Sequence, residues 1–317
     1  GRHLVDRLTA RGAKVAVMAR NLNNLPARFH EPGVVLLRGD ASRPEDVRRA
    51  VEGVPVVVNL AHGGGATTWE GMERAIVGGA RGVAEACLGA GVKRLVHVGT
   101  IAALDLGDPG AVVTGATPPD PKADARDHYT RAKASADTLL MEMHRDRGLP
   151  VTILRPGVVV GEGGIAFHPG IGFYNRERHC LGWNAGTNPL PLVLAEDVAD
   201  AIVRAMEAPA AVGRSYNLVG DVRLTAREYT EQLARALGRP LVFHPQGLTG
   251  QYAIEIVKWI VKKVAGRKDA LFPNRADLAS RGMPARFDTD DVKRDLGWHP
   301  VADRDRFVER AFAVHAG

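Results

Sequence analysis

Tyr129-Thr-Arg-Ala-Lys133 is the stretch on which the interpretation of this chain depends, because it places a tyrosine and a lysine four residues apart. Side chains at that spacing share one face of a helix. A nearby ammonium group favours the phenolate, so we expect Lys133 to lower the pKa of Tyr129 and make it an acid or base near neutral pH. A tyrosine and a lysine on a solvated helix would show the same spacing, and the flanking sequence has to decide between the two.

Two short apolar runs flank the Tyr129–Lys133 segment and predict β-strands. Arg94-Leu-Val-His-Val-Gly-Thr100 ends in a hydroxyl, and Val151-Thr-Ile-Leu-Arg-Pro-Gly157 is closed by proline and glycine. The hydroxyl of Thr100 is suited to hold a substrate oxygen beside Tyr129 during proton transfer. The alternative is a threonine that only hydrogen-bonds the backbone at the end of its own strand.

The rest of the chain alternates apolar runs with helical patterns, which predicts parallel β/α units. The expected strands are 14–19, 34–38, 54–60, 94–99, 151–154 and 215–219. The expected helices are 2–10, 43–52, 69–90, 123–147 and 196–208. The strands are rich in valine and leucine with little alternation, as in a sheet covered on both faces. We therefore predict an α/β fold with a Rossmann-type doubly wound parallel sheet.

The regular alternation stops after Gly161. Residues 162–192 are rich in glycine, proline and asparagine, whereas Thr225-Ala-Arg-Glu228 has the pattern of a helix capping box. We expect a smaller C-terminal substrate-binding lobe beside the sheet. The predicted division assigns 1–161 plus 193–220 to the NADP-binding domain, 162–192 plus 221–300 to the lobe, and 301–317 to a C-terminal helix.

The motifs, in this order, resemble the extended short-chain dehydrogenase/reductase family, whose members are often described as NAD-dependent epimerases and dehydratases. Tyr129-x-x-x-Lys133, the strand before Thr100 and Leu154-Arg-Pro-Gly157 match it, and Lys293-Arg-Asp-Leu-Gly-Trp-His-Pro300 resembles its closing motif. The family begins with a strand and a glycine-rich loop, of which Gly1 resembles the third glycine. The resemblance thus implies a further strand before Gly1, in the middle of the sheet, about a dozen residues long with its loop.

The resemblance also implies roles for individual residues. Thr100, Tyr129 and Lys133 would be catalytic, and Lys133 would in addition hold the nicotinamide ribose. Gly99 stands where many members carry a serine. The cofactor-binding residues would be Gly1, Arg20, Asp40, Leu60, Ala61, Lys133, Arg155 and Pro156. Asp40 has the alternative of a turn residue, and Arg155 that of a solvated arginine at a strand end.

The choice of cofactor depends on the end of the second strand of the family fold. An acid at that position binds the ribose hydroxyls of NAD, whereas an arginine nearby suits the 2′-phosphate of NADP. Ala19 stands at the acid's place and Arg20 follows it. We therefore expect NADP, with NAD as the alternative.

Composition limits the classes of protein to consider. The chain has 317 residues, 45% of them hydrophobic and 25% charged, as in ordinary globular proteins. It has no run of eighteen apolar residues, so we expect no membrane span. The net charge of +6 suits an anionic ligand, but the scattered arginines do not indicate nucleic-acid binding. Two cysteines without ligand-spaced partners predict neither a disulfide framework nor a metal site, and they fit a cytoplasmic location. We expect a homodimer acting on a small molecule.

Function and substrate are less closely determined. The leading hypothesis is an NAD(P)-dependent oxidoreductase or epimerase acting on a hydroxyl or ketone of a sugar nucleotide, with His168, Arg176 and Arg275 as substrate residues. Arg275 resembles the family arginine that binds a nucleotide diphosphate. One alternative is a hydroxysteroid-dehydrogenase-like or flavonol-reductase-like enzyme with an apolar substrate. Another is a non-catalytic NADP-binding sensor.

Residues 251–268 are predicted to form an amphipathic helix. Tyr252, Ile256, Trp259 and Ile260 follow roughly helical spacing, although Lys263 interrupts the edge of this stripe. Three interpretations remain open. The helix packs on its own lobe, it caps a pocket or touches an apolar partner, or it lies on a membrane surface.

Overall fold

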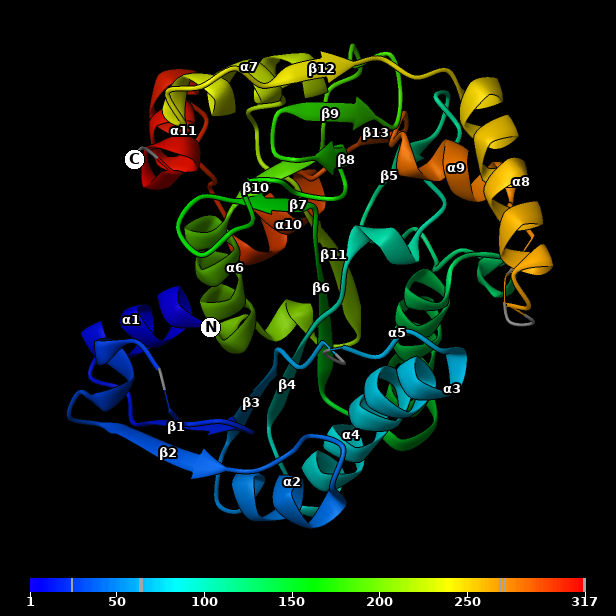
Figure 1. Ribbon diagram of the computed structural model, residues 1–317. Helices are drawn as coiled ribbons and strands as arrows, with labels where there is room; N and C mark the ends of the chain where they lie inside the picture. The colour runs from blue at the N-terminus through cyan, green and yellow to red at the C-terminus, as the bar shows by residue number, and fades with distance from the viewer. Residues whose placement is uncertain (24, 63–64, 268–269, 271, 316–317) are drawn as a thin grey trace.

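A computed structural model describes residues 1–23, 25–62, 65–267, 270 and 272–315. The predicted core strands are all present, with ends within two residues of those expected. They are β1 (Val15–Ala19), β2 (Val34–Arg38), β3 (Val56–Asn59), β4 (Arg94–Val98), β6 (Val151–Pro156) and β11 (Arg214–Leu218). Figure 1 shows these strands on one side of the molecule and the smaller lobe beside them.

The core strands are parallel and form two separate hydrogen-bonded groups. One has the order β11-β6-β4-β3 and the other is the pair β1-β2. No ladder joins β1 to β3 within the described residues.

Helices cover both faces of the sheet. On one face α1 (Arg2–Ala10) packs against α6 (Ala195–Glu207), and on the other lie α2 (Pro44–Val51), α4 (Gly79–Gly89) and α5 (His128–Arg147). Leu95 belongs to the apolar cluster on the side of α4 and α5, and Val96 to the cluster on the side of α6. Successive strand residues point to opposite faces, so this pair confirms the doubly wound arrangement.

The helix expected over residues 69–90 is interrupted. It consists of α3 (Trp69–Met72), a π-helical segment at Glu73–Gly78 and then α4. The π-helical turns insert an extra residue into the hydrogen-bond ladder, which periodicity in the sequence does not reveal.

The lobe is built around a small sheet of order β12-β9-β8, flanked by α7 (Ala226–Ala236). Its strands are β8 (Gly172–Asn175), β9 (His179–Gly182) and β12 (Val242–His244). The predicted capping box of α7 is confirmed, because the Glu228 backbone N–H donates to Thr225 Oγ1 at 3.2 Å and the Thr225 N–H donates to Glu228 Oε2 at 2.7 Å.

Short parallel pairs connect the lobe with the core. β5 (Val112–Val113) pairs with β13 (Arg286–Phe287), and β7 (Val158–Val160) pairs with β10 (Leu192–Leu194). The final helix, α11 (Arg304–Phe312), packs on α7. At the far edge of the lobe α8 (Leu248–Val264) contacts α9 (Arg275–Arg281). None of the described helices is long and apolar enough to cross a bilayer.

The end of the lobe differs from the predicted division at residue 300. α10 (Asp290–Leu296) and Trp298 pack on α6 and β11, within the core, although the sequence placed them in the lobe. Trp298 is fully buried, and its Nε1–H donates to the Asp197 carbonyl at 2.9 Å. The closing motif is therefore a packing element of the sheet domain.

Replacing Trp298 with alanine should lower the free energy of unfolding by about 3–5 kcal/mol, because a large buried aromatic leaves a cavity. Phe173→Ala is the control, since Phe173 is 61% exposed and should lose little. Chemical denaturation followed by circular dichroism measures both. Equal losses in the two variants would show that Trp298 does not anchor the core.

Candidate active site

The side chains of Thr100 and Tyr129 meet at the carboxyl end of β4. Asp127 caps α5, its Oδ1 accepting from the backbone N–H groups of Tyr129 at 3.0 Å and Thr130 at 3.1 Å. This cap fixes Tyr129 in the first turn, where the Thr100 side chain is near enough to its hydroxyl to oppose the rise in its pKa. Thr100 Oγ1 also accepts from the Ala102 N–H at 3.2 Å. Thr100 thus makes the local backbone contact of the alternative interpretation, and its side chain also lies near Tyr129.

Lys133 lies one helical turn beyond Tyr129 and is almost completely buried. Its Nζ is 5.9 Å from the centroid of the Tyr129 ring. Burial lowers the pKa of Lys133, and the negative charge of Asp137 opposes that change. No hydrogen bond to the Lys133 ammonium group occurs within the part of the chain that the structure describes. Its donors are available to a bound molecule.

The pKa of Tyr129 is shifted upward, opposite to the lowering expected from the sequence. Burial raises the pKa of Tyr129, the Thr100 side chain partly offsets this, and Asp127 and Asp137 raise it further. Although 38% of Tyr129 is exposed, desolvation is the largest influence on its pKa, and Lys133 is not among the causes of the shift. Desolvation of the phenolate therefore outweighs the attraction that the spacing suggested.

A buried ion pair behind Lys133 was missed by the sequence analysis. Asp137, four residues after Lys133, accepts from Arg155 Nε at 2.7 Å, and both side chains are buried. Arg155 Nη1 also donates to the Thr117 carbonyl at 3.0 Å. Arg155 is therefore not the solvated arginine considered as an alternative, and its guanidinium is engaged with the protein. The sequence signal for this carboxylate was that Asp137 follows Lys133 by four residues, which places both on one face of the helix.

Gly99 makes room for the same carboxylate. A β-carbon at this position would lie 2.9 Å from Asp137 Oδ1, closer than such atoms approach. Asp137 Oδ1 itself has no hydrogen-bond partner within the described residues. Gly99 stands at a position where many family members carry serine. Its lack of a side chain leaves space for the Asp137 carboxylate.

Several expected cofactor residues lie at the ends of β1, β2 and β3. Arg20 is exposed directly after β1, and its charge contributes to lowering the pKa of Asp40. Asp40 Oδ1 accepts from the Ser42 N–H and hydroxyl, both at 2.9 Å, so it does serve as a turn residue. Leu60 is partly exposed beside Gly1.

The remaining two expected cofactor residues are held mainly by backbone contacts. The Ala61 N–H donates to Asn59 Oδ1 at 3.0 Å. Pro156 ends β6 and is paired in register with Leu218 of β11.

The expected substrate residues are not drawn together. His168 is half-buried in the loop after β7, its Nδ1 accepts from the Gly170 N–H at 3.0 Å, and burial lowers its pKa to about 4. Arg176 is exposed in the turn between β8 and β9, and Arg275 is exposed at the start of α9. No hydrogen bond or ion pair joins any two of these three side chains.

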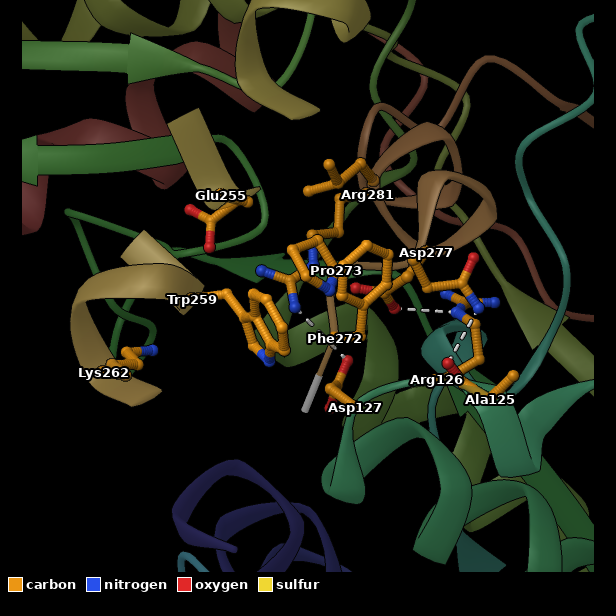
Figure 2. A pocket seen from close by; sticks show the side chains of 12 residues that line it. Ala125, Arg126, Asp127, Glu255, Trp259, Lys262, Phe272, Pro273, Asp277 and Arg281 are labelled. Carbon is orange, nitrogen blue, oxygen red and sulfur yellow. Dashed lines mark hydrogen bonds and ion pairs between the residues drawn. The ribbon is translucent and has the colours of Figure 1, made fainter. Parts of the chain in front are cut away.

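Buried charges join the lobe to the start of α5. Arg126 donates to Asp120 at 2.6 Å and to Asp277 of α9 at 2.8 Å, and all three side chains are largely buried. Arg281 pairs with Asp277 at 2.9 Å and approaches Asp127 at 3.7 Å. Figure 2 shows Arg126, Asp127, Asp277 and Arg281 around a pocket between the start of α5, α8 and α9.

This pocket lies beside the Thr100–Tyr129–Lys133 group but is not lined by it. It is lined by Ala125, Arg126, Asp127, Glu255, Trp259, Lys262, Phe272, Pro273, Asn274, Asp277, Leu278 and Arg281. Its link to the predicted site is Asp127, the residue that caps the helix of Tyr129.

Comparison with known proteins agrees with a Rossmann-like, NAD(P)-dependent enzyme. The model of the NAD dependent epimerase/dehydratase family matches residues 1–219. The chain therefore belongs to this family, and the expected fold class is confirmed.

Characterised relatives share about a quarter of the sequence. A (4-alkanoyl-5-oxo-2,5-dihydrofuran-3-yl)methyl phosphate reductase from Streptomyces griseus is 28% identical over 90% of this chain and 90% of its own length. A 2-alkyl-3-oxoalkanoate reductase from Stenotrophomonas maltophilia is 26% identical over 100% of this chain and 96% of its own. Among solved structures, a UDP-glucuronic acid 4-epimerase from Bacillus cereus has a TM-score of 0.72 at 16% identity, covering 100% of this chain and 95% of its own. That likeness concerns the fold.

We predict that Tyr129 ionises above the usual tyrosine pKa of about 10 in the cofactor-free protein, because burial disfavours the phenolate. The measurement is the tyrosinate absorbance of wild type minus that of Tyr129→Phe across a pH titration. The difference isolates Tyr129 from the other tyrosines. An ionisation near neutral pH would contradict this prediction and restore the original expectation that Lys133 lowers the pKa.

Proposed function

We propose that this protein is an NADP(H)-dependent reductase of a ketone, working with Thr100, Tyr129 and Lys133. The observation that carries the proposal is the proximity of the Tyr129 hydroxyl to the Thr100 side chain, one helical turn before a buried ammonium group. A nicotinamide cofactor supplies the hydride. Retention of all three residues argues against a non-catalytic sensor, which needs none of them for chemistry.

The side chains have separate tasks in this proposal. Tyr129, with its raised pKa, is protonated at neutral pH and donates its hydroxyl proton to the carbonyl oxygen as charge develops there. Thr100 Oγ1 hydrogen-bonds the same oxygen and orients it. The Lys133 ammonium holds ribose hydroxyls with its three donors, while Asp137 maintains its charge. In the reverse direction Tyr129 accepts the proton of an alcohol.

We infer an apolar, alkyl-bearing ketone as the substrate, in preference to a sugar nucleotide. A diphosphate needs converging cations, whereas Arg176 and Arg275 are exposed and do not meet each other. The buried arginines at the lobe junction, Arg126 and Arg281, already have carboxylate partners. The names of the two relatives also specify reductases of alkyl- or alkanoyl-bearing oxo compounds, each with one anionic group, a phosphate or a carboxylate, and without a diphosphate.

The cofactor in this proposal is NADP(H). Arg20 is exposed at the end of β1, close enough to Asp40 to influence its pKa, and a 2′-phosphate would meet its guanidinium there. The preceding position, where an acid would bind the ribose hydroxyls of NAD, is Ala19.

Tyr129→Phe should reduce turnover by about two to four orders of magnitude, the usual contribution of general acid catalysis. NADP affinity should be nearly unchanged, because the phenyl ring remains. Tyr252→Phe, which removes a hydroxyl from a helix away from Thr100, serves as the matched control and should keep full activity. Turnover is measured with 2-alkyl-3-oxoalkanoates and UDP-sugars side by side. Near-normal activity of Tyr129→Phe rejects the catalytic assignment, and activity restricted to UDP-sugars rejects the apolar substrate.

Arg20→Ala should weaken NADP binding by roughly ten- to a hundredfold, equivalent to about 1.5–3 kcal/mol for a charge-assisted contact. NAD binding should change little, because it lacks the 2′-phosphate. Arg11→Ala is the control, because Arg11 lies at the C-terminal end of α1, opposite Gly1, and pairs with Glu207. Calorimetric titration of both cofactors gives the affinities. Tighter binding of NAD than of NADP by the wild type would overturn the preference.

A further inference from the structure

The outer face of α8 is apolar and exposed among the residues that the structure describes. Its solvent-facing residues include Ile254, Val257, Ile260, Val261 and Val264, which are between 48% and 84% exposed. With about 3.6 residues per turn, they fall on one continuous side of the helix. Isolated exposed apolar residues are common, but a contiguous stripe marks an interaction surface.

The opposite side attaches α8 to the rest of the protein. Gln251 is buried and donates through Nε2 to the Gly182 carbonyl at 2.9 Å. Trp259 packs edge-on against Phe272 with ring centroids 5.1 Å apart, and Figure 2 shows Glu255 and Trp259 beside the pocket. This attachment agrees with the interpretation that α8 packs on its own lobe, although Ile260 of the predicted stripe lies on the outer side instead. The stripe of Tyr252, Ile256 and Trp259 faces inward, and Lys268 lies outside the described residues.

The charged residues at the borders of the outer stripe are mostly basic. Helix α8 carries Lys258, Lys262 and Lys263 against a single acid, Glu255, which pairs with Lys258 at 2.7 Å. Helical spacing places Lys258 and Lys262 along one border of the stripe and Lys263 along the other. No acidic residue lies within the stripe itself. An apolar centre with lysines at its margins complements a surface of acyl chains beneath anionic headgroups.

We propose that α8 lies in the plane of an anionic lipid surface, with the Val257–Val261 side immersed and the lysines at headgroup level. The helix is at the periphery of the molecule, where a flat surface can reach it (Figure 1). It has 17 residues, and none of the described helices can span a bilayer, so the contact is interfacial. This inference rests on α8 alone and is independent of the reaction assigned to Tyr129.

A second copy of the chain fits this stripe less well. A standard protein interface uses about 20–30 residues from each partner, whereas the stripe is a single row on one helix. Two copies meeting through α8 would also bring the lysine borders together. A lipid surface has neither limitation.

Co-sedimentation with vesicles tests the proposal. The full chain should pellet with vesicles of phosphatidylcholine and phosphatidylglycerol at low salt, and binding should fall with added salt or without phosphatidylglycerol. Val257→Asp combined with Val261→Asp should reduce partitioning by roughly tenfold or more, because two carboxylates enter the immersed side. Lys262→Gln should reduce it by about fivefold, the contribution of one basic residue near an anionic surface.

The matched control places the same charges elsewhere. Val35→Asp with Val112→Asp alters two valines that are 56% and 52% exposed on strands away from α8, and should bind as wild type does. Circular dichroism and thermal midpoints verify that each variant is folded. Wild type that stays in the supernatant, or aspartate variants of α8 that bind equally well, would overturn the proposal. It would also be overturned if sedimentation velocity showed a dimer broken by the α8 variants and vesicles bound neither form.

Discussion

The ion pair between Asp137 and Arg155 is the interaction around which the predicted site is organised. It joins the middle of α5 to the end of β6, and through Arg155 it also holds the loop at Thr117. Both groups are withdrawn from water, and removing one partner of such a pair typically costs about 3–5 kcal/mol, because the other charge remains buried alone. Lys133 lies between this pair and Tyr129 along the helix. The geometry of the reactive face thus depends on charges that are remote from solvent.

A second set of buried charges relates the lobe to the same helix. Arg126 precedes the Asp127 cap and is held by Asp120 from its own loop and by Asp277 from α9. The start of α5 therefore contacts the lobe on one side and the sheet domain on the other. Any shift of α9 would be transmitted to the cap of the helix that carries Tyr129, because fully paired buried charges leave little freedom to slide.

Local patterns in the sequence predicted the sheet well because each pattern reports a local cause. Valine-rich runs became strands, the strand ending before Thr100 lies beside α5, and Thr225 with Glu228 capped α7 as their spacing required. Properties that depend on distant groups were not predictable in this way. The pKa of Tyr129 is raised by burial, which a spacing of four residues does not reveal. The inner and outer sides of α8 are both apolar, so periodicity alone could not tell which one faces solvent.

The absence of a side chain at Gly99 restricts which substitutions this site can accept during evolution. A β-carbon there would lie 2.9 Å from Asp137 Oδ1, so the carboxylate that accepts from Arg155 through Oδ2 would have to shift. Positions 99, 137 and 155 are consequently expected to be epistatic, since a substitution tolerated at one depends on what occupies the other two. A serine at position 99 would require an adjustment of the Asp137 carboxylate. Evolution of the strand end that bears Thr100 is thereby tied to a residue in the middle of a neighbouring helix.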